Sequence, residues 1–118
     1  MTIDKICLKS ALEELASREQ QERVWLGLEP GVMSSFVEMA CFIFSYPLLG
    51  AAMDSGDLRK WYGKSVNEKA EKLRKLVRAF PPDLSPLDEI NHPMMNEIRL
   101  VAQALLNSAL FWEDAPPR

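Results

Sequence analysis

The chain has 118 residues, of which 47% are hydrophobic and 26% are charged, and its formal net charge is −3. This length is typical of one domain, and the balance of apolar and charged residues excludes a largely disordered chain. We therefore expect a single helical domain over residues 1–118, with residues 113–118 as a disordered tail.

The first expected helix runs from about Asp4 to Ala16, with apolar residues at helical spacing on one face and charged residues on the other. Ser17–Gln20 then has the spacing of a capping box, in which two side chains satisfy free backbone donors at a helix start. The short second helix is expected to end at Gly27, because glycine adopts the left-handed conformation that closes helices.

The most apolar segment of the chain begins with Ser35–Glu38, which repeats the capping-box spacing. Because this segment is hydrophobic on all sides, we expect it to form the central core helix at about 35–46. The longer stretch 36–53 approaches the length of a membrane-spanning helix, but Glu38 and Pro47 interrupt it and no basic flank orients it. We therefore expect two buried helices that meet at the proline, and no membrane association.

A polar turn at 54–57 precedes the next helical region. Ser65–Glu68 is a third capping box, and an apolar stripe at helical spacing follows it. Glu68–Lys72 and Glu71–Lys75 are i,i+4 pairs in the favourable order, and each is expected to stabilise the helix slightly.

The last helix is expected to start at Asn91 or His92, immediately before Pro93, because proline is favoured in the first turn of a helix. Alternating strand patterns are nearly absent from the chain. The sequence thus predicts an all-α fold, a compact bundle of five or more helices around a central apolar helix at about 35–46.

The residue types argue against catalysis and metal binding. His92 is the single histidine, and its position before a proline favours a capping or surface role. Cys7 and Cys41 lie in apolar stretches without metal-ligand spacing, so we expect two reduced, buried thiols. The isolated glycines form no phosphate-binding loop. We expect no enzyme activity, no metal and no cofactor.

The N-terminal residues 1–22 contain acids where a secretory signal needs an uninterrupted apolar stretch. We therefore expect the protein to be cytoplasmic, in agreement with the expected reduced thiols.

Charge is segregated along the chain. Residues 1–58 contain four basic and nine acidic residues, a net charge of −5, residues 59–80 have a net charge of +6, and the remainder has −4. One interpretation makes 59–78 a nucleic-acid patch, with Trp61 and Tyr62 available for base stacking. We prefer a solvated helix face, because the chain is acidic overall, and we do not expect nucleic acid to be the partner.

The acidic N-terminal region favours a protein partner instead. Its field would steer a basic partner toward the chain, and an exposed tryptophan beside a charged run is a typical interface anchor. The candidate partner-binding residues are Glu13, Glu14, Glu19, Glu22, Glu29, Trp61 and Tyr62.

Four short runs, VWLG at 24–27, SSFVE at 34–38, HPM at 92–94 and EIR at 97–99, resemble small bacterial immunity proteins. Such proteins are encoded beside polymorphic or contact-dependent growth-inhibition toxins. The resemblance implies a non-catalytic, cytoplasmic protein that binds and neutralises one cognate toxin domain, with its acidic surface facing a basic toxin. It carries over no binding residue.

Two other hypotheses remain open. In the first hypothesis the chain is a nucleic-acid-associated regulator that uses residues 59–78. In the second it is a homo-oligomeric helical scaffold, such as a homodimer, and part of the apolar 36–53 segment is buried in a subunit interface.

Overall fold

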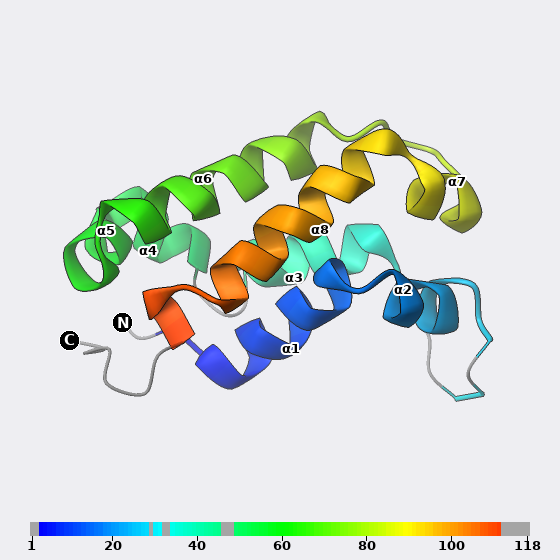
Figure 1. Ribbon diagram of the computed structural model, residues 1–118, viewed down its shortest axis with the longest axis horizontal. Helices are drawn as coiled ribbons and strands as arrows, with labels where there is room; N and C mark the ends of the chain where they lie inside the picture. The colour runs from blue at the N-terminus through cyan, green and yellow to red at the C-terminus, as the bar shows by residue number, and fades with distance from the viewer. Residues whose placement is uncertain (1–2, 29, 32–33, 46–48, 112–118) are drawn as a thin grey trace.

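The computed structural model describes residues 3–28, 30–31, 34–45 and 49–111. Within these ranges the chain forms eight α-helices, one 3-10 helix and no strand, which confirms the predicted all-α bundle (Figure 1). The elements in chain order are α1 (Lys5–Ala16), α2 (Arg18–Trp25), α3 (Phe36–Ser45), α4 (Leu49–Ser55), α5 (Asp57–Tyr62), α6 (Lys64–Ala79), α7 (Pro86–Asn91), α8 (Pro93–Leu106) and η1 (Ala109–Phe111).

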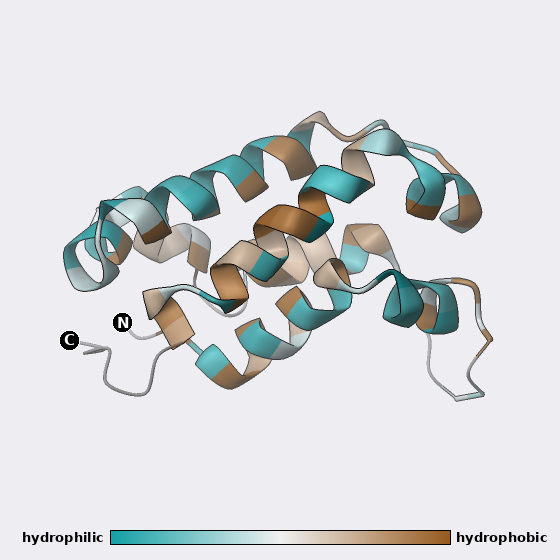
Figure 2. Cartoon of the chain, in the orientation of Figure 1, coloured by the Kyte–Doolittle hydropathy of each residue, from teal (hydrophilic) through white to brown (hydrophobic). Residues whose placement is uncertain are grey.

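The centre of the bundle is α8, which lies between α1 and α6 (Figure 1). Met95, Ile98 and Leu105 of α8 are fully buried, and Figure 2 shows the hydrophobic residues of α6 along the edge that faces α8. The expectation that the helix at about 35–46 is central is therefore wrong. That helix is α3, which packs mainly against α1 and α4, whereas the longer α8 contacts helices on two sides.

Side-chain caps begin α1, α2 and α3, and the sequence predicts those of α2 and α3. Asp4 accepts a hydrogen bond at 3.1 Å from the backbone N–H three residues later, and this bond lowers the pKa of Asp4. Ser17 Oγ accepts from the backbone N–H of Gln20, and Ser35 Oγ accepts from that of Glu38, both at 3.1 Å. These caps fix where α1, α2 and α3 begin.

The third predicted capping box is wrong. α6 begins at Lys64, and its N-cap is Gly63, whose φ of 99° is favourable only for glycine. Ser65 Oγ accepts a hydrogen bond from Lys69 Nζ at 2.6 Å instead of capping the helix.

Sequence patterns did not predict α7. Ser85 Oγ accepts from the backbone N–H of Asp88 at 3.2 Å, and Pro86 occupies the first turn. His92 follows, and its Nδ1 accepts from the backbone N–H of Met94 at 3.1 Å, which confirms the predicted cap of α8.

A row of rings joins four helices on one side of the core. The ring centroids of Trp25 and Phe36 are 6.0 Å apart, those of Phe36 and Phe80 are 4.5 Å apart, and those of Phe80 and His92 are 5.0 Å apart. This row holds the start of α3 against the C-terminal end of α6 and fixes how these two helices lie relative to each other.

No single helix in the described ranges is long and apolar enough to cross a bilayer, and α3 with α4 satisfies the criterion only as a bent pair. Pro47, where the two helices were expected to meet, lies outside the described residues, as does the segment 113–118. The expectation of two buried thiols is wrong, because Cys41 is exposed and Cys7 is only half-buried.

Candidate partner-binding surface

α3 is apolar on more sides than its neighbours cover. Phe36, Ala40 and Ile43 point into the core, whereas Val37 keeps 62% of its surface exposed and Cys41 is exposed. Residues 37 and 41 are four positions apart and therefore lie on the same outer face of the helix. α3 thus presents an apolar face that no other described helix covers.

Two hollows flank this outer face. One of about 180 Å³ lies between α1 and α3 and has Cys7, Met39 and Phe42 in its lining. The other, of about 190 Å³, lies between α3 and α6, and its lining includes Cys41, Phe44, Val77, Arg74 and Arg78.

A larger hollow of about 920 Å³ runs along the C-terminal half of α6. It shares Arg74 and Arg78 with the hollow beside α3, so the two adjoin. Leu76 and Ala79 contribute apolar lining, while Lys72 and Lys75 contribute positive charge. The smaller hollow thus connects Cys41 and Phe44 of α3 with the basic hollow along α6.

Arg74 determines the charge of this groove. Its guanidinium donates hydrogen bonds to Asp54 Oδ1 at 2.9 Å and to Glu71 Oε1 at 3.2 Å, and its side chain is only 14% exposed. Burial lowers the pKa of Arg74, but the hydrogen bonds and charges of Asp54 and Glu71 raise it above its ordinary value. One arginine therefore holds both of these acids.

The two predicted i,i+4 pairs of α6 are not formed, and Arg74 explains one of them, because Glu71 pairs with it rather than with Lys75. Lys72, Lys75 and Arg78 consequently make no ion pair within the described part of the chain. We call this region the α3–α6 surface, which consists of the exposed Val37 and Cys41, the half-buried Phe44 and Val77, and the basic Lys72, Lys75 and Arg78.

The acidic residues predicted to bind a partner have different surroundings. Glu13 and Glu19 are exposed, and Glu13 lines a polar hollow of about 470 Å³ that α1, α2 and α8 border. Glu22 forms an ion pair with Arg18 at 3.3 Å. Glu29 lies outside the described residues.

Glu14 was expected on the solvated side of its helix but serves inside the fold. Its Oε2 accepts hydrogen bonds from Trp25 Nε1 and from Ser34 Oγ, both at 2.8 Å. The carboxylate therefore ties α1 to the end of α2 and to the segment before α3, and it is removed from the set of free surface acids.

The aromatic pair predicted as an interface anchor is largely inside the molecule. Tyr62 is buried, and Lys5 Nζ lies 4.7 Å from the centroid of its ring. Trp61 is half-buried and packs against the core. Tyr62 is therefore unavailable for stacking on a base or on a partner.

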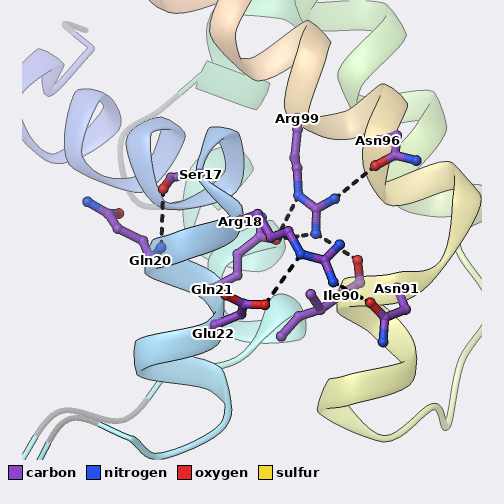
Figure 3. Close-up of polar contacts among 9 residues, drawn as sticks. All are labelled: Ser17, Arg18, Gln20, Gln21, Glu22, Ile90, Asn91, Asn96 and Arg99. Carbon is purple, nitrogen blue, oxygen red and sulfur yellow. Dashed lines mark hydrogen bonds and ion pairs between the residues drawn. The ribbon is translucent and has the colours of Figure 1, made fainter.

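Figure 3 shows a polar cluster in which Arg99 of α8 reaches Gln21 of α2. Gln21 is fully buried, and its Oε1 accepts from Arg99 Nε at 2.9 Å and from Nη2 at 2.8 Å. Arg99 also donates to the carbonyl of Ile90 at 2.7 Å and to Asn96 at 3.0 Å. Burial lowers the pKa of Arg99. Because four donor bonds are satisfied internally, the cluster supports the fold rather than offering a ligand site.

His92 Nδ1 is occupied as a helix cap, and the described residues contain no group of three side chains that would hold a metal ion. Comparison of the chain with protein-family models, curated proteins and solved structures found no match. The α3–α6 surface is therefore the feature on which a functional argument rests.

The sequence predicted that Val37 and Cys41 lie in a buried core helix, and only the homo-oligomer hypothesis placed part of 36–53 in an interface. A signal was present, because a ten-residue helix with apolar residues on every side needs neighbours on every side. Only the packing shows that no other described helix covers one face of α3.

Proposed function

We propose that this chain is a non-catalytic protein that acts by binding a protein partner. The observation that carries the proposal is the outer face of α3, where Val37 and Cys41 stay exposed and Cys41 lines the hollow between α3 and α6. Apolar residues gathered at the surface next to pockets are typical of protein-binding sites, because a partner's side chains fill such pockets and exclude water.

The resemblance to immunity proteins supports a more specific form of the proposal. In that form the partner is a bacterial toxin domain, the complex forms in the cytoplasm, and binding blocks the toxin's active site or the entry of its substrate. A chain that neutralises by occlusion needs a stable surface and no catalytic groups of its own.

Co-expression tests this function directly. The chain would be expressed with the product of the neighbouring gene in a toxin-sensitive host, and growth and complex formation would be measured. We expect the host to survive and the two proteins to elute as one complex in gel filtration. Unprotected growth arrest together with separate elution would contradict the proposal.

Two surfaces compete as the docking site of such a partner. The sequence favours the exposed acids Glu13 and Glu19, whereas the packing favours Val37 and its neighbours. The double variant Glu13→Lys/Glu19→Lys and the single variant Val37→Asp, compared in the same protection assay, decide between the two surfaces.

A further inference from the structure

We propose that the α3–α6 surface binds an amphipathic helical segment of the partner that carries apolar side chains on one face and acidic side chains beside them. This inference rests on the proposed function and adds the location of the site and the chemistry of its ligand. It assigns the acidic charge of the interface to the partner rather than to this chain.

The shape of the surface favours a helix as the ligand. Val37, Cys41 and Phe44 are spaced i, i+4 and i+7, so they form a stripe along α3. The hollow along α6 runs for about two helical turns, from residue 71 to residue 79, and it shares Arg74 and Arg78 with the smaller hollow that Cys41 and Phe44 line. An amphipathic helix fills such a groove with apolar anchors at the same spacing.

The charge of the surface favours acidic residues on that helix. Lys72, Lys75 and Arg78 occur within two turns and make no ion pair with any other described residue. Asp54 and Glu71 both pair with Arg74, and together with Lys72, Lys75 and Arg78 these six groups carry a net charge of +2, so this part of the surface stays basic. Carboxylates beside the apolar face of a partner helix would complement this charge.

The same charge argues against a second copy of this chain. A two-fold contact through the α3–α6 surface would place the three cations of one copy near those of the other, which is destabilising. Nucleic acid fits less well, because the surface has an apolar floor and Tyr62 is buried.

A peptide-display selection tests the proposal before the partner is identified. The folded chain would be offered a library of random 18-residue peptides, with Val37→Asp as the counter-selection target. We expect enriched peptides to have apolar residues at i, i+3, i+4 and i+7 and flanking aspartate or glutamate. Enrichment of basic peptides, of extended motifs or of nothing above background would overturn the proposal.

Matched variants then locate binding of an enriched peptide on the structure. Val37→Asp and the double variant Lys75→Glu/Arg78→Glu are expected to weaken binding by roughly tenfold or more. The controls carry the same changes elsewhere, Leu100→Asp on α8 at a residue that is 70% exposed, and Arg59→Glu/Lys60→Glu on α5. The controls should bind as tightly as the parent, and equal losses in both sets would overturn the proposal.

Charge reversal and two further measurements complete the test. A peptide with lysine in place of its acids should bind the Lys75→Glu/Arg78→Glu variant better than the parent chain. Dimerisation in sedimentation that Val37→Asp abolishes, or tight binding of a single-stranded oligonucleotide that Lys75→Glu/Arg78→Glu abolishes, would each assign the surface to another occupant.

The outcome is separable from that of the proposed function. If the parent chain protects the host and the Val37→Asp variant protects it equally well, the proposed function is supported and the α3–α6 surface is excluded as the binding site. If the product of the neighbouring gene does not bind and the host is not protected, but an acidic helical peptide still binds the α3–α6 surface, the binding site is supported and the toxin-neutralising role is contradicted.

Discussion

Gln21→Leu is the substitution that most directly tests how the polar cluster supports the fold. The fully buried Gln21 amide donates to the backbone carbonyls of Leu15 at 2.9 Å and Glu14 at 3.2 Å, and it accepts two hydrogen bonds from Arg99. Leucine has a similar volume but makes none of these bonds. The change therefore leaves the last carbonyls of α1 and a partly buried guanidinium without their partner.

The expected loss follows from the number and kind of bonds. Hydrogen bonds to a charged group contribute about 1.5–3 kcal/mol each, and Gln21 makes two of them with Arg99. We expect a loss near 4 kcal/mol, out of a total stability of roughly 5–15 kcal/mol. With a urea m-value of about 2 kcal/mol/M, the unfolding midpoint should fall by about 2 M.

Urea unfolding followed by circular dichroism measures this loss. Gln20→Leu is the matched control, because Gln20 is the adjacent residue, is half-buried and makes no side-chain hydrogen bond in the described part of the chain. It should change stability by less than about 0.5 kcal/mol. Adding Arg99→Leu to Gln21→Leu should cost less than the sum of the two single changes. A Gln21→Leu loss below about 1 kcal/mol, or strict additivity, would show that the Gln21–Arg99 bonds do not stabilise the fold.

Three further predictions concern the helices around the candidate surface. A Cβ at Gly50 would lie 2.5 Å from the carbonyl oxygen of Phe44, so Gly50→Ala should push α3 away from α4 and lower the melting temperature by about 8 °C; an unchanged melting temperature would contradict this contact. Glu14→Ala should cost about 2 kcal/mol and shift the emission of Trp25, whereas Glu14→Gln, which keeps an acceptor, should cost less; identical losses would contradict this role. Burial raises the pKa of Glu89, so the folded state binds the Glu89 proton more tightly than the unfolded chain does. Proton binding by Glu89 therefore stabilises the folded state at low pH, and this stabilisation is lost as pH rises through the raised pKa. Glu89→Gln should therefore stabilise the protein at about pH 7 and lose this advantage at about pH 4, and an equal gain at both pH values would argue against a buried carboxyl group.

Helix identity was largely predictable from the sequence because it depends on local signals. Ser17 and Ser35 begin their helices through side-chain caps, and a run of apolar residues at helical spacing marks α8. α7 escaped prediction because six residues are too few for a periodic pattern, although Ser85 and Pro86 are ordinary start signals.

The candidate surface was not predictable, because its parts depend on tertiary packing. Nothing local to Val37 shows that α3 lies at the side of the bundle rather than at its centre. Glu71 has a lysine at the favourable spacing, but Arg74 takes it because Arg74 also reaches Asp54, which is 20 residues away in the sequence. The buried bonds of Glu14 likewise depend on residues brought close only by folding.

Site-specific crosslinking from α3 would show whether a partner docks on the α3–α6 surface. A photoreactive group would be attached to Cys41 in a Cys7→Ser background, and to a Leu100→Cys variant that lacks both native cysteines, and each would be used in the co-expressed complex. We predict that Cys41 crosslinks to an acidic, amphipathic helical segment of the partner and that position 100 does not. Crosslinks from position 100 alone, or from Cys41 to a basic surface, would contradict the account.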